Sequence, residues 1–368
     1  MPEPRPRILL LSAYRADSHA AWADWLTRRF DAWDWEVLEL PGRHFRWRIR
    51  GNPLSWLERL EGLRPDAVVA SSMVDLATLR GLHPGLAGVP ALYYFHENQF
   101  AYPTGAGQFR SVDPQMVQLY GALAADRVWF NSSFNRESFL DGVETLLRRM
   151  PDAVPPGVRQ RLESRSGVLP IPLPALPDTA AGARDPRLIV WNHRWEYDKA
   201  PGRFAEAMLE LAARGVEFRL ALLGARPRQT PEPLQRLRAR LGTRIVADGK
   251  LPRADYAALL RRAAVVISTT LHEFQGLAML EATAAGATPL VPDALVYPEQ
   301  YPAAYRYPPG DTAALVRRLE VWLENGRPAP PPVDAWSEAA LLPRWHDALA
   351  GLLPALRAAP APVPAGDQ

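Results

Sequence analysis

The chain has 368 residues, 48% of them hydrophobic and 23% charged, and a formal net charge of +3 at pH 7. It contains no apolar run near the ~18 residues that a membrane span needs, and no secretory leader opens it, so we expect a cytoplasmic protein without a membrane partner. The absence of cysteine excludes disulfides, thiolate catalysis and cysteine-ligated zinc. The length exceeds that of one ordinary core and predicts two domains.

Short β-rich runs alternate with helical patterns through the first half of the chain. Apolar or β-branched runs predict strands at 7–12, 35–40, 66–71, 89–95 and 126–131. Helical patterns begin at Ser18, with that residue as N-cap, and recur near 54–62, 74–80, 113–124 and 133–147. This order predicts a doubly wound parallel sheet, in which ligands bind beyond the carboxyl ends of the strands.

The segment 43–51, RHFRWRIRG, alternates large apolar residues with arginines, and no acidic residue lies between Glu39 and Glu58. As an extended strand it would place Arg46, Arg48 and Arg50 on one face, about 6.6 Å apart. Two interpretations stay open. The arginines are either a solvated strand edge that discourages pairing, or a ridge that binds a polyanion.

A proline-rich segment, 169–186, interrupts the alternation and predicts an interdomain linker. Strands are expected again at 187–192, 217–224, 244–249, 263–269 and 288–292, and helices near 311–324 and 336–358. The predicted domains are 1–176 and 185–358, followed by a flexible tail, 359–368. Two such sheets predict a cleft between the domains, where an enzyme with two substrates would work.

The clearest motif is TTLHEFQGLAMLEATAAGATPLVP at 269–292, which reads as strand, loop, helix and strand. It places Glu273 at the carboxyl end of a strand and Glu281 more than one turn into the helix. The helix is expected to begin around Gly276, Leu277 and Ala278, where unpaired N–H groups and the positive dipole end form a diphosphate seat. The alternative for Glu281 is a solvated helix residue.

The segment WNHRWEYDK at 191–199 follows the first strand of the second domain. Arg194 and Lys199 can converge there on one phosphate, the first as a planar fork and the second as a point charge. Lys199 and Lys250 are the two lysines among 43 basic residues. This rarity favours a phosphate-binding role for Lys199, whereas Lys250 is expected on the surface. An ion pair with Glu196 or Asp198 is the alternative for either cation.

Polar residues also follow three predicted strands of the first domain. They are Ser18 and His19, then His96, Glu97, Asn98 and Gln99, then Asn131 and Ser132. We expect these residues at the ligand-binding edge, although a lone histidine is more often structural and Ser132 can simply cap a helix. The chain has no P-loop, catalytic triad, histidine-rich metal set or G-x-G-x-x-G fingerprint, which argues against a dinucleotide oxidoreductase.

HEFQGLAMLEATAAG together with HRWEYDK is similar to the retaining GT-B glycosyltransferases, which use nucleotide-diphosphate sugars. SAYRADSHAAWADWL, LPGRHFRWRIRG, ASSMVDLATLRGL, FHENQFAYP and FNSSFNRESF resemble, in that order, the N-terminal region of the tRNA-queuosine α-mannosyltransferases. These enzymes move mannose from GDP-mannose to queuosine in the tRNA anticodon. The resemblance implies a GT-B fold, with two Rossmann-like domains facing each other across a cleft.

The resemblance also implies roles for individual residues. On the donor side, Arg194 and Lys199 would bind the pyrophosphate with Gly276, Leu277 and Ala278, Glu273 would face the sugar, and Glu281 would hold the ribose. His193 is expected among these donor contacts, and His96 joins Arg194, Lys199 and Glu273 as a catalytic candidate. The acceptor side would use residues of the first domain: Ser18, His19, Arg46, Trp47, Arg48, Arg50, Glu97, Asn98, Gln99, Asn131 and Ser132.

The implied partners are a tRNA carrying queuosine and a nucleotide sugar, with no cofactor and no metal. Retention of configuration is likewise implied by the resemblance. Trp47 is either a core anchor or a stacking platform for a base. Two alternatives stay open for the whole chain. The first alternative is a GT-B enzyme with another nucleotide sugar and a lipid, polysaccharide or small-molecule acceptor. The second is an RNA-binding protein with an inactive sugar site.

Overall fold

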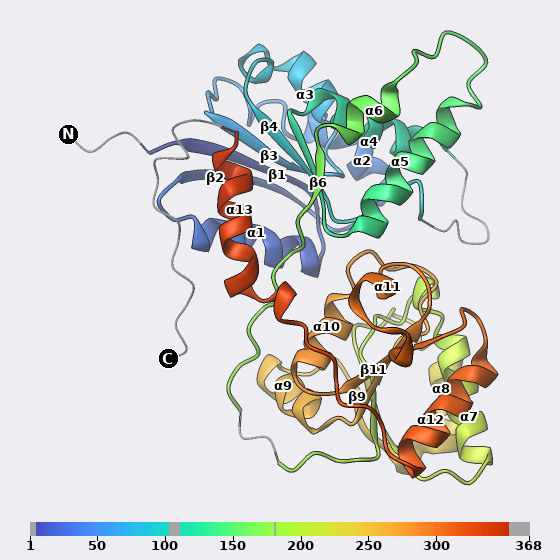
Figure 1. The fold of residues 1–368 in the computed structure, drawn as a ribbon. Coiled ribbons are helices and arrows are strands. Elements are labelled where there is room, and N and C mark those ends of the chain that lie inside the picture. The colour runs from blue at the N-terminus through green and yellow to red at the C-terminus, as the bar shows by residue number, and fades with distance from the viewer. Residues whose placement is uncertain (1–4, 103–110, 180–181, 353–368) are drawn as a thin grey trace. The chain divides into compact units, whose positions relative to one another are not determined.

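The computed structural model describes residues 5–102, 111–179 and 182–352 and divides into two compact units (Figure 1). Unit 2 is Pro172–Ser337, and unit 1 consists of the described residues on both sides of it. The predicted tail, 359–368, and the end of the predicted last helix lie outside the described residues.

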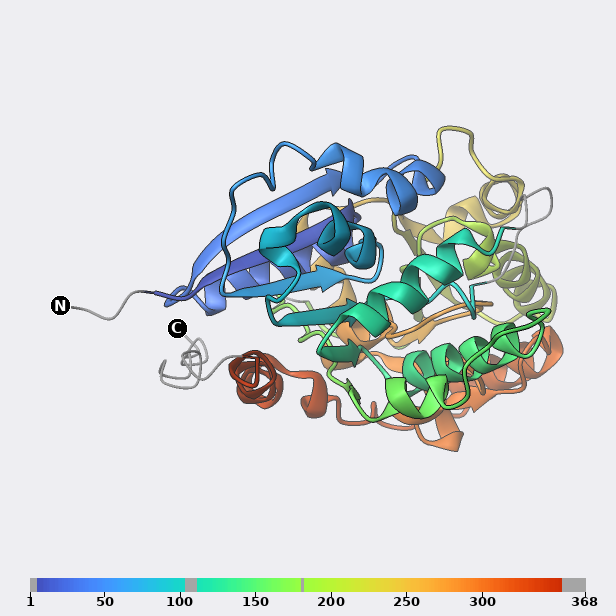
Figure 2. The ribbon, with the colours of Figure 1, turned by 90° about the horizontal axis from the view of Figure 1, so that it is seen from above.

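Unit 1 contains one six-stranded sheet in which every pairing is parallel, with the strand order β2-β1-β3-β4-β5-β6. Its strands are β1 (Arg7–Arg15), β2 (Asp34–Pro41), β3 (Ala67–Ser71), β4 (Ala91–Phe95), β5 (Arg127–Phe130) and β6 (Ser166–Val168). Figure 2 shows β1, β2 and β3 running side by side in one direction. The predicted doubly wound sheet is confirmed, while β6 lies in a region for which no strand was predicted.

Helices cover both faces of this sheet. One face packs against α1 (Asp17–Arg29) and α13 (Glu338–Ala350). The other packs against α2 (Phe45–Ser55), α3 (Leu76–Leu82), α4 (Asp113–Ala124), α5 (Ser133–Leu147) and α6 (Val158–Glu163). Because both faces are covered, β3 and β4 are buried along their whole length, as their continuous apolar sequences require.

The last helix, α13, was assigned to the second domain from its place in the sequence, and the structure corrects this. The ring of Trp345 lies 5.0 Å from that of Tyr94 on β4, and its indole N–H donates to the carbonyl of Pro170 at 2.9 Å. Arg29 on α1 donates to Glu338 at 3.0 Å. The chain therefore returns from unit 2 to complete the core of unit 1.

The segment 43–51, which was considered as an extended strand, forms most of α2 instead. Helix α2 ends at Ser55, so the helix predicted near 54–62 does not form as such. Ile49 and Asn52 point inward, a spacing typical of a helix. Pro53 lacks the N–H that would bond the carbonyl of Ile49, and the Asn52 side-chain amide donates to this carbonyl at 3.2 Å. The arginines 46, 48 and 50 therefore do not form a single row.

Unit 2 repeats the architecture with a second parallel sheet, ordered β12-β11-β10-β7-β8-β9. Its strands are β7 (Leu188–Trp191), β8 (Arg219–Leu223), β9 (Ile245–Gly249), β10 (Val265–Ile267), β11 (Thr288–Pro292) and β12 (Arg306–Tyr307). Its helices are α7 (Pro201–Ala213), α8 (Glu232–Leu241), α9 (Arg253–Arg262), α10 (Leu277–Ala284), α11 (Tyr297–Gln300) and α12 (Thr312–Glu324). Helices α7, α8 and α12 pack over one face of this sheet.

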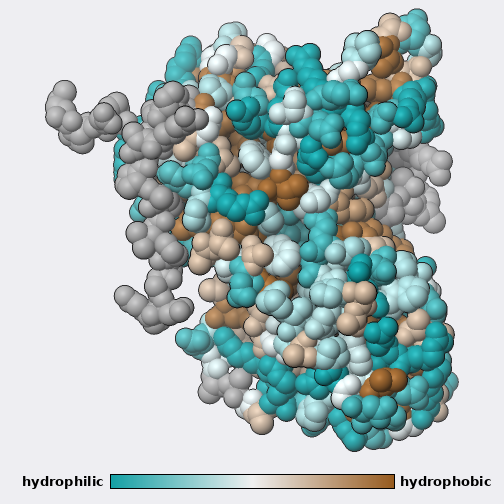
Figure 3. Space-filling view, in the orientation of Figure 1, coloured by the Kyte–Doolittle hydropathy of each residue, from teal (hydrophilic) through white to brown (hydrophobic). Residues whose placement is uncertain are grey.

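Hydrophilic residues cover most of the surface drawn in Figure 3, and hydrophobic residues are confined to patches. Among the described residues, no helix is long and apolar enough to cross a membrane. In each unit the parallel strands bring their carboxyl ends to one edge of the sheet, and the candidate residues follow those ends.

Candidate active site

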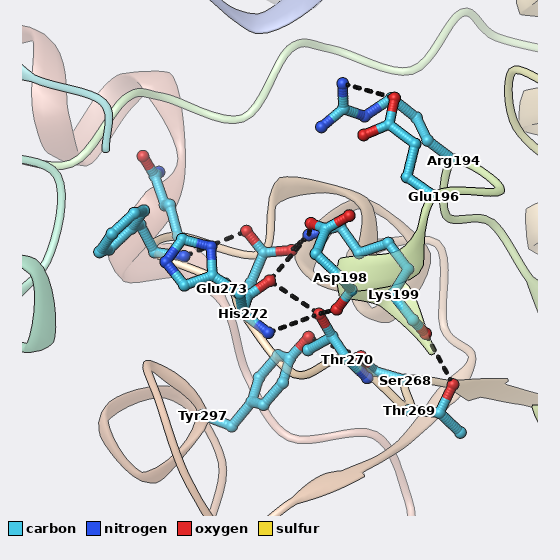
Figure 4. A network of polar contacts seen from close by, with 12 residues as sticks. Arg194, Glu196, Asp198, Lys199, Ser268, Thr269, Thr270, His272, Glu273 and Tyr297 are labelled. Carbon is cyan, nitrogen blue, oxygen red and sulfur yellow. Dashed lines mark hydrogen bonds and ion pairs between the residues drawn. The ribbon is translucent and has the colours of Figure 1, made fainter. Parts of the chain in front are cut away.

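Lys199, which is buried, and Glu273, which is partly buried, form an ion pair at the carboxyl edge of the unit 2 sheet (Figure 4). Lys199 Nζ lies 3.0 Å from Glu273 Oε2 and 3.3 Å from Asp198 Oδ2, and it donates to the carbonyl of His272 at 2.9 Å. The two partners come from loops that follow neighbouring strands, β7 and β10. Lys199 therefore donates two hydrogen bonds and has a second carboxylate nearby.

Lys199 and Glu273 each stabilise the ionised form of the other. Burial alone would lower the pKa of Lys199, but the carboxylates of Glu273 and Asp198 raise it above its ordinary value. Burial would raise the pKa of Glu273, yet Lys199, His193 and the Gly276 backbone N–H together lower it to about 2. Both groups are therefore ionised at neutral pH.

The carboxyl end of β7 carries buried polar atoms that lack a hydrogen-bond partner within the described part of the chain. They are Asn192 Oδ1, His193 Nε2 and Asp198 Oδ1. Burial and the nearby Lys199 lower the pKa of His193 to about 3, so its ring is neutral at pH 7. Because orphaned buried polar atoms are costly, each of these three calls for an explanation, and a bound ligand is one.

Arg194 and Lys199 do not bring their head groups together in this structure. Arg194 pairs with Glu196 at 3.2 Å, and Figure 4 shows this pair apart from the Lys199–Glu273 cluster. Each cation has the carboxylate partner that the sequence offered as the alternative, Glu196 or Asp198. The Arg194 side chain is half exposed, at 52%, and could turn toward a ligand.

Helix α10 begins where the motif predicted. Gly276 is its N-cap, in the left-handed conformation with φ 65°, and Leu277 and Ala278 follow in the first turn. The first amides of a helix lack internal partners, so this end attracts an anion. Glu273, three residues earlier, is therefore placed between a buried cation and a helix N-terminus.

Glu281 is buried, which contradicts the interpretation of a solvated helix residue. Its carboxylate accepts from Arg253 at 2.7 Å and from the hydroxyl of Tyr256 at 3.2 Å. Asn192 donates to Tyr256 at 3.0 Å and to the carbonyl of Ala278 at 2.8 Å. Arg253, Tyr256 and Asn192 were not predicted, because a pairing between distant segments leaves no local pattern in the sequence.

In unit 1, His19 and His96 stack with ring centroids 4.0 Å apart. His19 Nε2 donates to Glu97 Oε2 at 3.1 Å, and Trp22 packs edge-on against His96 at 4.8 Å. Neither ring nitrogen of His96 has a hydrogen-bond partner among the described residues. Burial and the adjacent His19 lower the pKa of His96 well below its ordinary value, so its imidazole is neutral.

Other predicted acceptor residues make hydrogen bonds within the described fold. The Asn98 amide donates to Asn135 Oδ1 at 2.9 Å, and Asn131 donates to the carbonyl of His96 at 2.8 Å. Ser132 is the N-cap of α5 and accepts from the backbone of Asn135, as its alternative interpretation proposed. Together these contacts fix the loop that carries His96 and Glu97.

The remaining predicted residues are placed as follows. The Gln99 backbone donates to Gln118 at 2.7 Å, which also fixes the loop. Ser18 is exposed within α1, and the N-cap of this helix is Ala16 rather than Ser18. Within residues 5–102, 111–179 and 182–352, no group of three His, Asp or Glu side chains is placed to hold a metal ion.

The arrangement in unit 2 can bind a ligand that is anionic at one end and rich in hydroxyls elsewhere. The α10 N-terminus and nearby cations suit the anion, and the Glu273 and Glu281 carboxylates accept from hydroxyls. The comparisons agree with this chemistry. Residues 7–173 match the model described as tRNA-queuosine alpha-mannosyltransferase N-terminal, and residues 186–325 match the model described as glycosyl transferases group 1.

A tRNA-queuosine alpha-mannosyltransferase of Drosophila melanogaster is 34% identical over 327 residues, covering 86% of each chain. The chain belongs to the tRNA-queuosine alpha-mannosyltransferase family. It is therefore a glycosyltransferase, and the resemblance inferred from its sequence is confirmed.

Solved structures share the fold of this tRNA-queuosine alpha-mannosyltransferase family member. The apo form of the lipopolysaccharide outer core galactosyltransferase WaaB has a TM-score of 0.65 at 12% identity, covering 95% of this chain and 100% of that one. The sucrose-phosphate synthase of Thermosynechococcus elongatus has a TM-score of 0.63 at 15% identity, covering 91% of each chain. At these identities the likeness is one of fold, and it confirms the predicted GT-B class.

Proposed function

We propose that this family member transfers mannose from GDP-mannose to the queuosine of a cytoplasmic tRNA, with retention of configuration. The observation that carries the proposal is the ionised Lys199–Glu273 pair beside the N-terminus of α10. That constellation suits a sugar joined to a diphosphate. The acceptor follows from the family, whose Drosophila melanogaster relative is named for it.

In the proposed reaction, negative charge develops on the departing diphosphate as the glycosidic bond breaks. The first amides of α10, together with Lys199 and the exposed side chain of Arg194, would stabilise this negative charge. Glu273 would accept a hydrogen bond from a sugar hydroxyl, and Glu281 one from the ribose. These groups supply the positive charge themselves, so the proposal includes no metal and no cofactor.

The unit 1 site would present a neutral polar group to the acceptor. His96 is uncharged, and its ring nitrogens have no hydrogen-bond partner among the described residues. The stacked ring of His19, held by Glu97, fixes the orientation of the His96 imidazole. His96 can therefore donate or accept one hydrogen bond without the cost of moving a charge out of water.

The test is a transfer assay with a tRNA that contains queuosine and the same tRNA lacking it. Each is incubated with GDP-mannose or with UDP-sugars and digested to nucleosides, whose masses are compared. We expect one hexose on queuosine with GDP-mannose alone, and release of this hexose by an α-mannosidase. Transfer from another donor or to a lipid or polysaccharide would contradict the proposal. Binding of tRNA without any transfer would favour the inactive RNA-binding alternative.

A further inference from the structure

We infer that the outer face of α2 is an RNA-contact surface, on which Trp47 stacks on an unpaired base while Arg43 and Arg46 bind neighbouring phosphates. This inference rests on the proposed function and deepens it, because it names the part of unit 1 that holds the tRNA. Helix α2 lies within residues 7–173, the part that matches the N-terminal model of the family.

The helical form of this segment, which the sequence did not predict, decides which side chains face outward. Ile49 and Asn52 are buried, whereas Trp47 and Leu54 are 52% and 64% exposed. Residues 47, 50 and 54 are three, four and seven positions apart and therefore share the opposite face of the helix. The indole of Trp47 is thus not a core anchor.

The Trp47 indole is held in place by the helix itself. A Cβ atom added to Gly51 would lie 2.5 Å from Trp47 Cε2, so the indole rests directly on the Gly51 backbone. Only glycine leaves room for this contact. The ring is covered on one side and half exposed overall, which is the geometry of a pre-oriented stacking platform.

The segment that carries this platform is rich in arginine. No acidic residue occurs from 40 to 57, and Arg43 and Arg46 are exposed. Arg50 lies on the same face but donates to Asp75 at 2.7 Å, which neutralises part of its charge. An exposed aromatic ring in an arginine-rich segment matches a single-stranded nucleic acid, whose bases stack and whose phosphates attract arginine.

The experiment measures binding of a fluorescently labelled anticodon stem-loop RNA to the full chain over a range of salt concentrations. Trp47→Ala should weaken binding roughly tenfold or more, with an unchanged slope of log affinity against log salt, because stacking is lost but no phosphate contact. Trp47→Phe should restore most of the affinity. Arg46→Ala should instead reduce the slope by about 0.7 to 0.9.

A second variant displaces the indole without removing it. Gly51→Ala places a methyl group where the ring lies, so it should weaken RNA binding as Trp47→Ala does. In the Trp47→Ala background the same change should have no additional effect, since its effect acts through the indole. The matched control is Arg127→Ala, an exposed arginine at the amino end of β5, which should bind RNA like the parent chain.

Unchanged RNA binding in both Trp47→Ala and Gly51→Ala would overturn the proposed RNA-contact surface. Binding to vesicles of anionic lipid is measured in parallel, and a Trp47→Ala defect seen only with these vesicles would overturn it as well. The two proposals fail separately. If the parent chain transfers mannose to tRNA and the variants bind RNA as well as the parent does, only the RNA-contact surface is contradicted. Loss of RNA binding in the variants of a chain that never modifies queuosine contradicts only the function.

Discussion

Lys199 Nζ lies 3.0 Å from Glu273 Oε2, and this pair joins the loops after β7 and β10. The lysine also holds the buried Asp198, so a single cation serves two carboxylates. Its removal would leave uncompensated negative charge in a place from which water is largely excluded. This dependence makes Lys199 a structural residue as well as a candidate for donor binding.

We therefore predict that Lys199→Ala lowers the free energy of unfolding by about 3–5 kcal/mol, the usual cost of removing one partner of a buried ion pair. Transfer activity should fall at least ~100-fold, because a transition-state contact is lost. Urea unfolding and single-turnover assays measure the two effects. Lys250→Ala, which changes the exposed second lysine, should alter stability by less than about 0.5 kcal/mol. Equal stability of both variants would contradict the coupling.

The depressed pKa of Glu273 predicts loss of stability in acid. Its pKa of about 2 in the fold lies below its ordinary value of 4.5, so the unfolded chain binds a proton that the folded chain does not. This contribution is complete above about pH 4.5 and is lost as the pH falls toward about 2. Unfolding measured across that window should show a shallower pH dependence for Glu273→Gln. An identical slope would count against the ionised form.

The lowered pKa of His96 predicts a second loss of stability in acid, which begins at a higher pH than that of Glu273. Its pKa is lowered in the fold by burial and by His19, so the unfolded chain takes up the proton first as the pH falls below about 6.5. Stability should therefore decrease with falling pH from that point. His96→Phe should reduce the slope by about 1.4 kcal/mol per pH unit, the value for one proton. His193 acts in the same direction and remains in the variant, so part of the slope should persist.

Gly276 is predicted to resist substitution because of its backbone conformation. At φ 65°, an alanine costs roughly 1–2 kcal/mol, and its Cβ would lie 3.3 Å from the ring of Tyr297. Thermal unfolding of Gly276→Ala should show this loss. Gly242→Ala is the matched control, since Gly242 has φ −53° and nothing within 4 Å of an added Cβ. A control as destabilised as Gly276→Ala would show that the conformation is not the cause.

Trp345 on α13 is predicted to be essential to the core of unit 1. The ring is fully buried, and its replacement by alanine should cost about 3–5 kcal/mol. Trp47→Ala removes the same side chain from an exposed position and should change stability little. Denaturant unfolding of the two variants compares them directly. Comparable losses would contradict the packing of α13 on unit 1.

The strand and helix order was predictable because buried parallel strands are short apolar runs between amphipathic helices. The positions of Lys199, Glu273 and His96 followed, since His96 comes directly after such a run and the other two lie in the loops that follow one. Polar residues at a strand end have two uses, however. They can bind a ligand or hold a loop, and the internal hydrogen bonds of Asn98 and Ser132 depend on contacts with Asn135 that the sequence pattern did not indicate.

Helix α2 shows the limit of periodicity. Phe45, Trp47 and Ile49 satisfy the alternation of a strand, while Phe45, Ile49 and Asn52 equally satisfy a helix. Pro53 is unfavourable inside a helix, and its compensation by the Asn52 amide depends on three-dimensional contacts. Similarly, the apolar stripe of α13 predicted burial but did not indicate which sheet would cover it.

The return of α13 to unit 1 has a consequence for the nascent chain. Unit 1 emerges from the ribosome first, but the helix that covers part of its apolar face follows all of Pro172–Ser337. At bacterial and eukaryotic synthesis rates, this delay lasts roughly 8 to 35 seconds. During that time the apolar face around Tyr94 and Trp22 lacks the cover of α13, and transiently exposed apolar surface of this kind promotes aggregation.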